Sequence, residues 1–275
     1  MRADLSNAGV ILLQPSRLTK QAKEKNIKTA QEGVRIQTTV TDADGSSRFV
    51  DEIWPYAASR PPFKMTEALP ATGISFRWTP GHFDFDYHPA PRKRLVLVTH
   101  GALEITASSG EARVFRCGDV LSIADTWGKG HRSRALNGEP FRSAFIALDD
   151  EVHLDRREPL ETDGQLNVPY VHNQEDQQGH SFFNNEAMPF CYGGPEGQVT
   201  EEIRLSAFQF VLAPPNLDYD WHPAPQRQIV LVLSGGLVME YGNGSRRAVN
   251  PGDFLLGEDT QGKGHIRSEE HTSEL

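Results

Sequence analysis

The sequence predicts an all-β protein made of two tandem antiparallel β-barrels of jelly-roll type, preceded by a short helical extension. Three observations support this prediction. The segment Phe83 to Leu103 recurs as Leu217 to Leu237, at an offset of 134 residues. Apolar and β-branched runs are short and are bounded by Gly, Pro and Asp, which is typical of antiparallel sandwiches and barrels. Helical patterns are scarce along the whole chain.

The internal repeat is gapless and has the size of a domain. Between Phe83 and His131, 22 of 49 positions are identical to the positions 134 residues later, and the same register extends back to Gly45. A solenoid has units of about 20 to 50 residues, so this period is too long for one. Each copy is therefore expected to be one barrel domain, at residues 33–149 and 167–267.

The N-terminal extension, residues 1–32, contains the best candidate for a helix. This candidate runs from Ser16 to Glu32, starts after a proline and ends before a glycine. Its many charges indicate a solvated element. Within the copies, the apolar runs Leu95 to Val98 and Ile229 to Leu233 are expected to form strands.

The regions that follow each copy have different compositions. An acidic stretch after the first copy predicts an interdomain linker at residues 150–166. The second copy ends in RSEEHTSEL, which is similar to the translation of a sequencing-adapter oligonucleotide. Residues 268–275 are therefore expected to be non-native, and His271 is not counted as a ligand. The second barrel is then expected to lack its final strand and to leave an unpaired edge.

The composition restricts the partners. The chain has 28 basic and 37 acidic residues, a formal net charge of −9. This balance disfavours nucleic acid, because phosphate binding requires a surplus of Lys and Arg. No apolar run approaches the roughly 20 residues of a membrane helix, and the first residues do not resemble a signal peptide. A cytoplasmic location is expected. Cys117 and Cys191 do not align in the repeat and are expected to be reduced thiols.

Several motifs occur in both copies: a Gly-Asp turn, a glycine after a VLV run, and a histidine on each side of that hairpin. Together they resemble the cupin superfamily, over the range Gly33 to His265. Cupins typically have a His-x-His pair followed by Glu or Gln and then Gly. A Pro-Gly-Asp turn and a third His come later. The resemblance implies a barrel in each copy, with a divalent metal bound inside it by these side chains.

In the second copy, the resemblance implies a metal site made of Asp220, His222, Gln228 and His265. Asp220 stands where cupins typically have their first His, and Pro251 to Asp253 form the intact turn. Alternate residues of a strand share a face, so Asp220 and His222 are expected to point the same way. Two imidazoles and one carboxylate favour Fe(II) or Mn(II), and Zn(II) or Ni(II) are also compatible with such a set.

The equivalent residues of the first copy are Asp86, His88, Arg94 and His131. Arg94 aligns with Gln228, and its permanent charge repels a dication. These residues could form a second metal site or an anion site in which the guanidinium binds bidentately. Arg94 could instead pair with Asp86 and leave no site. We therefore prefer the second copy as the metal site.

Structural roles remain open for the same motifs. The prolines after His88 and His222 also suit a rigid strand exit. Asp125 and Asp259 also suit tight turns in which their carboxylates accept backbone N–H bonds.

Two functions are compatible with these residues. One is a metal-dependent enzyme, a dioxygenase or an isomerase, acting on a small organic acid inside the barrel. The alternative is a non-catalytic module that binds a small molecule or assembles edge to edge, also as a homo-oligomer. A resemblance at the level of fold does not choose between these functions.

Overall fold

The computed structural model describes residues 8–15, 32–148, 158–159, 166–194 and 196–269. These ranges are built almost entirely of β-strands. Their only helical element is a short 3₁₀ turn, η1 (Leu136–Gly138). Within the same ranges, no helix has the length and apolar character needed to cross a membrane. The predicted all-β class is therefore confirmed.

The strands of the two sequence copies follow the same order along the chain. Those of the first copy are β2 (Gly33–Thr41), β3 (Ser47–Pro55), β4 (Ala58–Arg60), β5 (Phe63–Met65), β6 (Leu69–Pro70), β7 (Gly73–Thr79), β8 (Asp84–His88), β9 (Arg94–His100), β10 (Ala102–Ala107), β11 (Ala112–Arg116), β12 (Leu121–Ile123), β13 (His131–Ala135) and β14 (Phe141–Ala147). Those of the second copy are β16 (Asn167–Glu175), β17 (Ser181–Pro189), β18 (Tyr192–Gly194), β19 (Gly197–Val199), β20 (Ile203–Ala213), β21 (Asp218–His222), β22 (Gln228–Val232), β23 (Leu237–Tyr241), β24 (Arg246–Val249), β25 (Phe254–Gly257) and β26 (His265–Glu269). Two further strands, β1 (Ala8–Pro15) and β15 (Glu158–Pro159), lie outside the copies.

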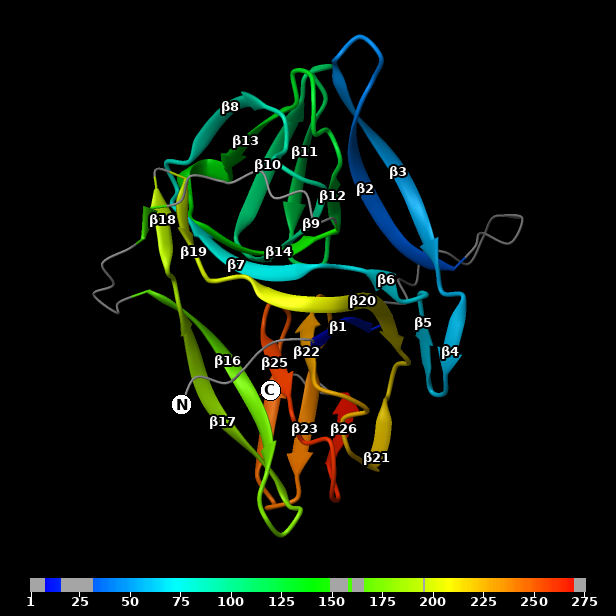
Figure 1. Cartoon of the computed structure of the whole chain (residues 1–275). Coiled ribbons are helices and arrows are strands. Elements are labelled where there is room, and N and C mark those ends of the chain that lie inside the picture. The colour runs from blue at the N-terminus through cyan, green and yellow to red at the C-terminus, as the bar shows by residue number, and fades with distance from the viewer. Residues whose placement is uncertain (1–7, 16–31, 149–157, 160–165, 195, 270–275) are drawn as a thin grey trace.

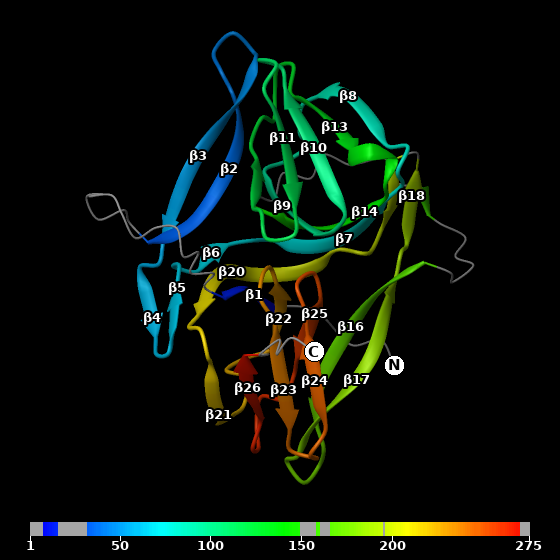
Figure 2. The same ribbon diagram turned by 180° about the vertical axis from the view of Figure 1, so that it is seen from behind.

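Each copy contributes one four-stranded sheet of its own. The order is β11-β10-β13-β8 in the first copy, and the second copy has the equivalent sheet of β21, β26, β23 and β24. The remaining strands form one 18-stranded sheet that both copies share. Strands β7 and β20 cross the middle of the molecule, and the two small sheets lie on opposite sides of them (Figure 1; Figure 2 from behind). The described strands form no closed barrel, so the division of the chain into two barrels stays a prediction.

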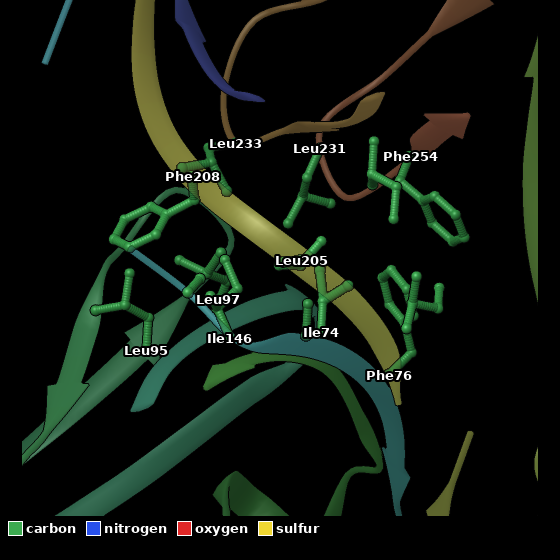
Figure 3. Packing of buried hydrophobic residues seen from close by; sticks show 14 of the residues in the cluster. Ile74, Phe76, Leu95, Leu97, Ile146, Leu205, Phe208, Leu231, Leu233 and Phe254 are labelled. Atoms are coloured by element: carbon green, nitrogen blue, oxygen red, sulfur yellow. The ribbon is translucent and has the colours of Figure 1, made fainter. Parts of the chain in front are cut away.

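The largest hydrophobic core lies between the two copies. Figure 3 shows side chains of β7 and β9 meeting those of β20, β22 and β25 across this layer. Phe76 and Phe254 stack with ring centroids 4.3 Å apart. A separate core fills each copy, around Phe115 in the first and Tyr241 in the second. Burial of apolar surface between the copies, at about 25 cal/mol per Å², therefore stabilises their association.

The N-terminal extension contains a strand rather than a helix over Ala8–Pro15. β1 pairs in parallel with both β20 and β22. In the first copy, β14 occupies the equivalent place between β7 and β9, in antiparallel orientation. The prediction that the second copy has an unpaired strand edge is therefore wrong, because β1 pairs with β20 and β22. Nearly all of the predicted helix, residues 16–31, lies outside the described residues.

The predicted tail begins within a strand. β26 extends to Glu269, and Ser268 pairs with both Asp218 and Val238. The remaining residues, 270–275 with His271, lie outside the described ranges. The predicted linker also contributes a short strand, since β15 pairs with β18.

Two hairpins dock on the sheet of the other copy. The β4–β5 hairpin belongs to the first copy, yet β5 pairs with β20 of the second. The β18–β19 hairpin belongs to the second copy, yet β19 pairs with β7 of the first. This reciprocal exchange brings residues of each copy to the other copy's interior.

Candidate functional site

A pair of histidines faces each interior. Antiparallel pairing of β8 with β13 places His88 opposite His131, with ring centroids 4.7 Å apart. Pairing of β21 with β26 places His222 opposite His265, at 4.6 Å. The predicted convergence of the histidines therefore occurs in both copies.

A glycine before the second histidine permits this approach. Gly130 has a φ of +66°, and a Cβ there would lie 1.9 Å from the carbonyl oxygen of His88. Gly264 has the same relation to His222, with a φ of +70° and a distance of 2.0 Å. Because L-residues disfavour this φ and a side chain has no room, only glycine suits the GKGH motif at this position.

The carboxylates of the predicted metal sets lie outside these interiors. The pairing shifts by one residue between Phe85 and His88, and again between Tyr219 and His222, which is a β-bulge. A bulge interrupts the alternation of faces. Tyr219 therefore joins His222 inside, with ring centroids 4.2 Å apart, whereas Asp220 is exposed.

The expectation that Asp220 and His222 share a face is thus wrong, and the equivalent Asp86 of the first copy is exposed as well. Each of these two carboxylates instead accepts a hydrogen bond from the backbone N–H of the residue that follows it.

Buried aspartates orient the second histidine of each pair. In the first copy, the Nδ1 of His131 lies 2.8 Å from Asp125 Oδ2, and Thr39 Oγ1 donates to Asp125 Oδ1 at 2.8 Å. In the second copy, Asp259 accepts from Nδ1 of His265. A carboxylate only accepts, so Nδ1 carries the proton in each case. The sequence leaves a role in tight turns open for these aspartates, and it does not predict their bond to the histidine. The recurrence of Asp and His six residues apart in both copies was the signal for the dyad.

The first histidine of each pair is held by its own strand. His88 Nδ1 lies 2.8 Å from the carbonyl oxygen of Asp86, and His222 Nδ1 lies 2.7 Å from that of Asp220. The carbonyl accepts, so each ring carries its proton on Nδ1 and has a lone pair on Nε2. The neutral form is favoured by burial, which lowers the pKa of His88 and lowers that of His222 to about 4.

Both histidines of the first copy line a cavity, whereas in the second copy His222 lines a cavity and His265 contacts two of its lining residues, His222 and Arg267. The first-copy cavity has a volume of about 270 Å³ and contains four phenyl rings in its wall, those of Phe83, Phe85, Phe141 and Phe145. The second-copy cavity has a volume of about 180 Å³ and is lined by Tyr219 and Phe63, among others. We refer to them below as the first cavity and the second cavity.

These two cavities are lined by repeated histidines on which the resemblance to cupins was based, His88 and His131 in the first and His222 in the second. No family sequence model and no curated protein sequence matches the chain.

Three similar solved structures cover most of the chain. A cupin 2 conserved barrel domain protein from Leptotrichia buccalis is 14% identical, with 78% of this chain and 86% of that chain covered and a TM-score of 0.34. A protein of unknown function from Pseudomonas syringae pv. tomato is 11% identical, with 86% and 95% covered and a TM-score of 0.33. AerE from Microcystis aeruginosa is 13% identical, with 76% and 85% covered and a TM-score of 0.30.

Two arginines line each cavity, Arg77 and Arg94 in the first and Arg60 and Arg267 in the second. Arg94 of β9 lines the first cavity, with its guanidinium 5.1 Å from the ring centroid of Phe145. In the second cavity the residue aligned with Arg94 is Gln228, and the arginine that comes from the same copy as His222 is Arg267 of β26. Arg267 is buried, and its Nε donates to His265 Nε2 at 3.1 Å. The sequence analysis did not single out Arg267, because it adjoins the suspected tail.

The resemblance to cupins implies a metal, but the side chains present do not fit one well. Among the described residues, no group of three or more His, Cys, Asp and Glu side chains is placed to hold a metal ion. In the second copy, Gln228 and His222 line the cavity, but Asp220 does not. The Nε2 of His265 already accepts a hydrogen bond from Arg267. In the first copy, Arg94 lines the cavity with the histidine pair. A guanidinium beside the histidines opposes a dication.

The role of these residues as metal ligands stays a prediction, and no reaction step is derived through a metal.

Proposed function

We propose that this chain is a bicupin, with one cupin unit per sequence copy, and that each unit binds a small organic anion in its cavity. The observation that carries this proposal is that each cavity is lined by an arginine whose aligned residue in the other copy is uncharged, Arg94 in the first cavity and Arg267 in the second. Arg94 in the first cavity faces a wall that contains Ser133, whereas the second cavity has Gln228 and Arg267 at the two equivalent positions. The arginine thus comes from β9 in the first cavity and from β26 in the second, so both cavities contain a positive charge.

A guanidinium suits a carboxylate because it donates two parallel hydrogen bonds to the two oxygens. The chain as a whole carries a net charge of −9, so these charges are local features of the cavities. Enclosure strengthens such a contact, because the effective dielectric constant of a buried site is lower than that of water.

Gln228 supplies a second donor in the second cavity. Its side chain is 1% exposed, and its Nε2 has no hydrogen-bond partner among the described residues. Buried polar groups are almost always hydrogen-bonded. A carboxylate oxygen of the ligand would satisfy this amide, and the neutral histidines could accept a hydrogen bond from a ligand hydroxyl.

Titration calorimetry with benzoate and butyrate tests the proposal. We expect the wild-type protein to bind at least one of these anions, and the double variant Arg94→Gln/Arg267→Gln to lose binding at least about 30-fold, as for a charge-assisted hydrogen bond worth about 2 kcal/mol. Lys93→Gln is the control, because it removes an exposed charge next to Arg94 that does not line the cavity. Equal affinity of the wild type and the double variant would refute the proposal.

A metal-dependent dioxygenase or isomerase is the second candidate, and the paired neutral imidazoles favour it, since His binds metals through a neutral nitrogen. Metal analysis of the purified protein separates the two functions. The anion proposal predicts little bound metal. About one equivalent of Fe or Mn that is lost in His222→Ala/His265→Ala would favour the enzyme.

A further inference from the structure

The mouth of each cavity is formed in part by the other copy. The β4–β5 hairpin places Arg60, Phe63 and Met65 in the lining of the second cavity. Phe63 makes an edge-to-face contact with Tyr219, with ring centroids 5.2 Å apart, and belongs to the core of the second copy. The exchanged β18–β19 hairpin places Glu196 in the lining of the first cavity. The two hairpins therefore bring a positive charge, Arg60, to the second cavity and a negative charge, Glu196, to the first.

The second cavity contains two guanidinium groups and no carboxylate. Arg267 and Arg60 line it, and none of the residues in its lining is Asp or Glu. Arg267 is buried at the inner wall, whereas Arg60 is exposed on the hairpin. The two guanidinium groups line the same cavity, and like charges in one cavity repel each other. A ligand with two negative charges would relieve this repulsion.

The wall between the two arginines is apolar. Phe63, Met65, Phe208 and Val211 line it. Gln228 also lines this cavity, and its Nε2 donor is buried without a hydrogen-bond partner among the described residues. This arrangement offers donors at an inner and an outer position, separated by a surface that suits methylene groups.

We infer that the second cavity selects a short dicarboxylate of four or five carbons, with one carboxylate on Arg267 and Gln228 and the other on Arg60. This inference rests on the proposed function, because it requires that the cavity binds carboxylates. It assigns specificity to a residue that the other sequence copy contributes.

The first cavity provides an internal contrast. Glu196 lies at its mouth and already binds Arg77, with Nη2 to Oε2 at 2.9 Å. A second carboxylate of a ligand would approach a like charge there, which weakens binding. Because the first cavity has this charge and the second does not, the two are expected to differ in their preference for dicarboxylates.

Titration calorimetry with glutarate and butyrate at neutral pH tests this inference, in an Arg94→Gln background that silences the first cavity. We expect glutarate to bind at least about 10-fold more tightly than butyrate, because it makes a second charge-assisted contact. Arg60→Gln is expected to remove this difference and to change butyrate affinity less than about two-fold. Arg267→Gln is expected to weaken both ligands.

Lys64→Gln is the matched control on the same hairpin. Lys64 is exposed and pairs with Glu32 at 2.5 Å, and it does not line the cavity. Its replacement is expected to leave the glutarate preference unchanged. If butyrate binds but glutarate shows no preference, or if the preference survives Arg60→Gln, the inference is overturned and the proposed function stands. If neither glutarate nor butyrate binds to the protein in which Arg94 and Arg267 are both intact, the proposed function fails as well.

Discussion

The two cavities share a backbone frame but differ in charge and size. Both have a bulged strand, a glycine that lets two strands approach, and an aspartate that orients a histidine. The first cavity is larger, at about 270 Å³ against 180 Å³, and has four phenyl rings and one carboxylate in its lining. The second has two arginines and no carboxylate, whereas the first also has two arginines, Arg77 and Arg94, of which Arg77 is paired with Glu196. The frame therefore positions the imidazoles, whereas residues at the wall and the mouth determine which ligand fits.

The hydrogen bonds behind the histidines also differ between the copies. Asp125 accepts from both Thr39 and His131. In the second copy, the aligned residue of Thr39 is Asn173, and Asp259 Oδ1 has no hydrogen-bond partner among the described residues. Asp259 thus accepts one hydrogen bond fewer than Asp125. The other ring nitrogen of His265 accepts a hydrogen bond from Arg267.

The largest expected effect is on stability. Asp125→Ala removes the acceptor of two buried donors and is expected to lower the free energy of unfolding by about 3 kcal/mol. Asp259→Ala removes the acceptor of one donor and is expected to cost about 2 kcal/mol. Urea denaturation followed by circular dichroism measures both values. A larger loss for Asp259→Ala would contradict the hydrogen-bond difference between the copies.

A second difference lies on β16, where His172 has Thr38 as its aligned residue in the first copy. His172 is buried between two carboxylates, with Nδ1 2.8 Å from Glu186 Oε1 and Nε2 2.6 Å from Glu258 Oε2. We expect His172→Thr to destabilise the protein by about 2 kcal/mol, because the single hydroxyl of threonine cannot bond to both Glu186 and Glu258 as the imidazole does. Thermal unfolding measures this loss. The reverse change, Thr38→His, is the control, and it is not expected to stabilise the first copy.

The charge at the mouth of the first cavity gives the next prediction. Glu196→Gln removes a carboxylate and leaves Arg77 without its ionised partner. We expect glutarate affinity for this cavity to rise about 10-fold, which is about 1.4 kcal/mol. The titration is carried out in an Arg267→Gln background, so that only the first cavity reports. Unchanged glutarate affinity would mean that the mouth does not select by charge.

The smallest effect is the pH dependence that His222 contributes. Burial lowers its pKa to about 4 in the folded protein, from an ordinary value of 6.5. Between these values the unfolded chain binds more protons, so the contribution is complete above pH 6.5 and is lost as the pH falls toward 4. We expect unfolding free energies measured at pH 7, 5.5 and 4.5 to decline less steeply in His222→Gln than in the wild type. Equal slopes would indicate that the imidazole is not desolvated.

Much of the fold could be predicted because it depends on local patterns and on the repeat. Short apolar runs with turn residues predicted strands, and the offset of 134 residues predicted two equivalent units. The pairs His88–His131 and His222–His265 were also predicted to converge, since each histidine recurs at the same place in both copies. The positions of the neighbouring aspartates could not be predicted from the alternation of side chains along a strand. One extra residue at a bulge moves the residues that follow it to the opposite face of the sheet.

The sequence by itself determined the β class, the duplication and the histidine pairs. Only the tertiary structure decided which side chains surround those histidines. Strand pairing between distant segments brings Arg60 and Glu196 into the opposite copies, and it seats β1 in a slot that β14 fills in the first copy. Such pairing is chosen by the hydrogen-bonding needs of strand edges and by apolar burial between the copies, and neither leaves a signal in the spacing of residues along one segment.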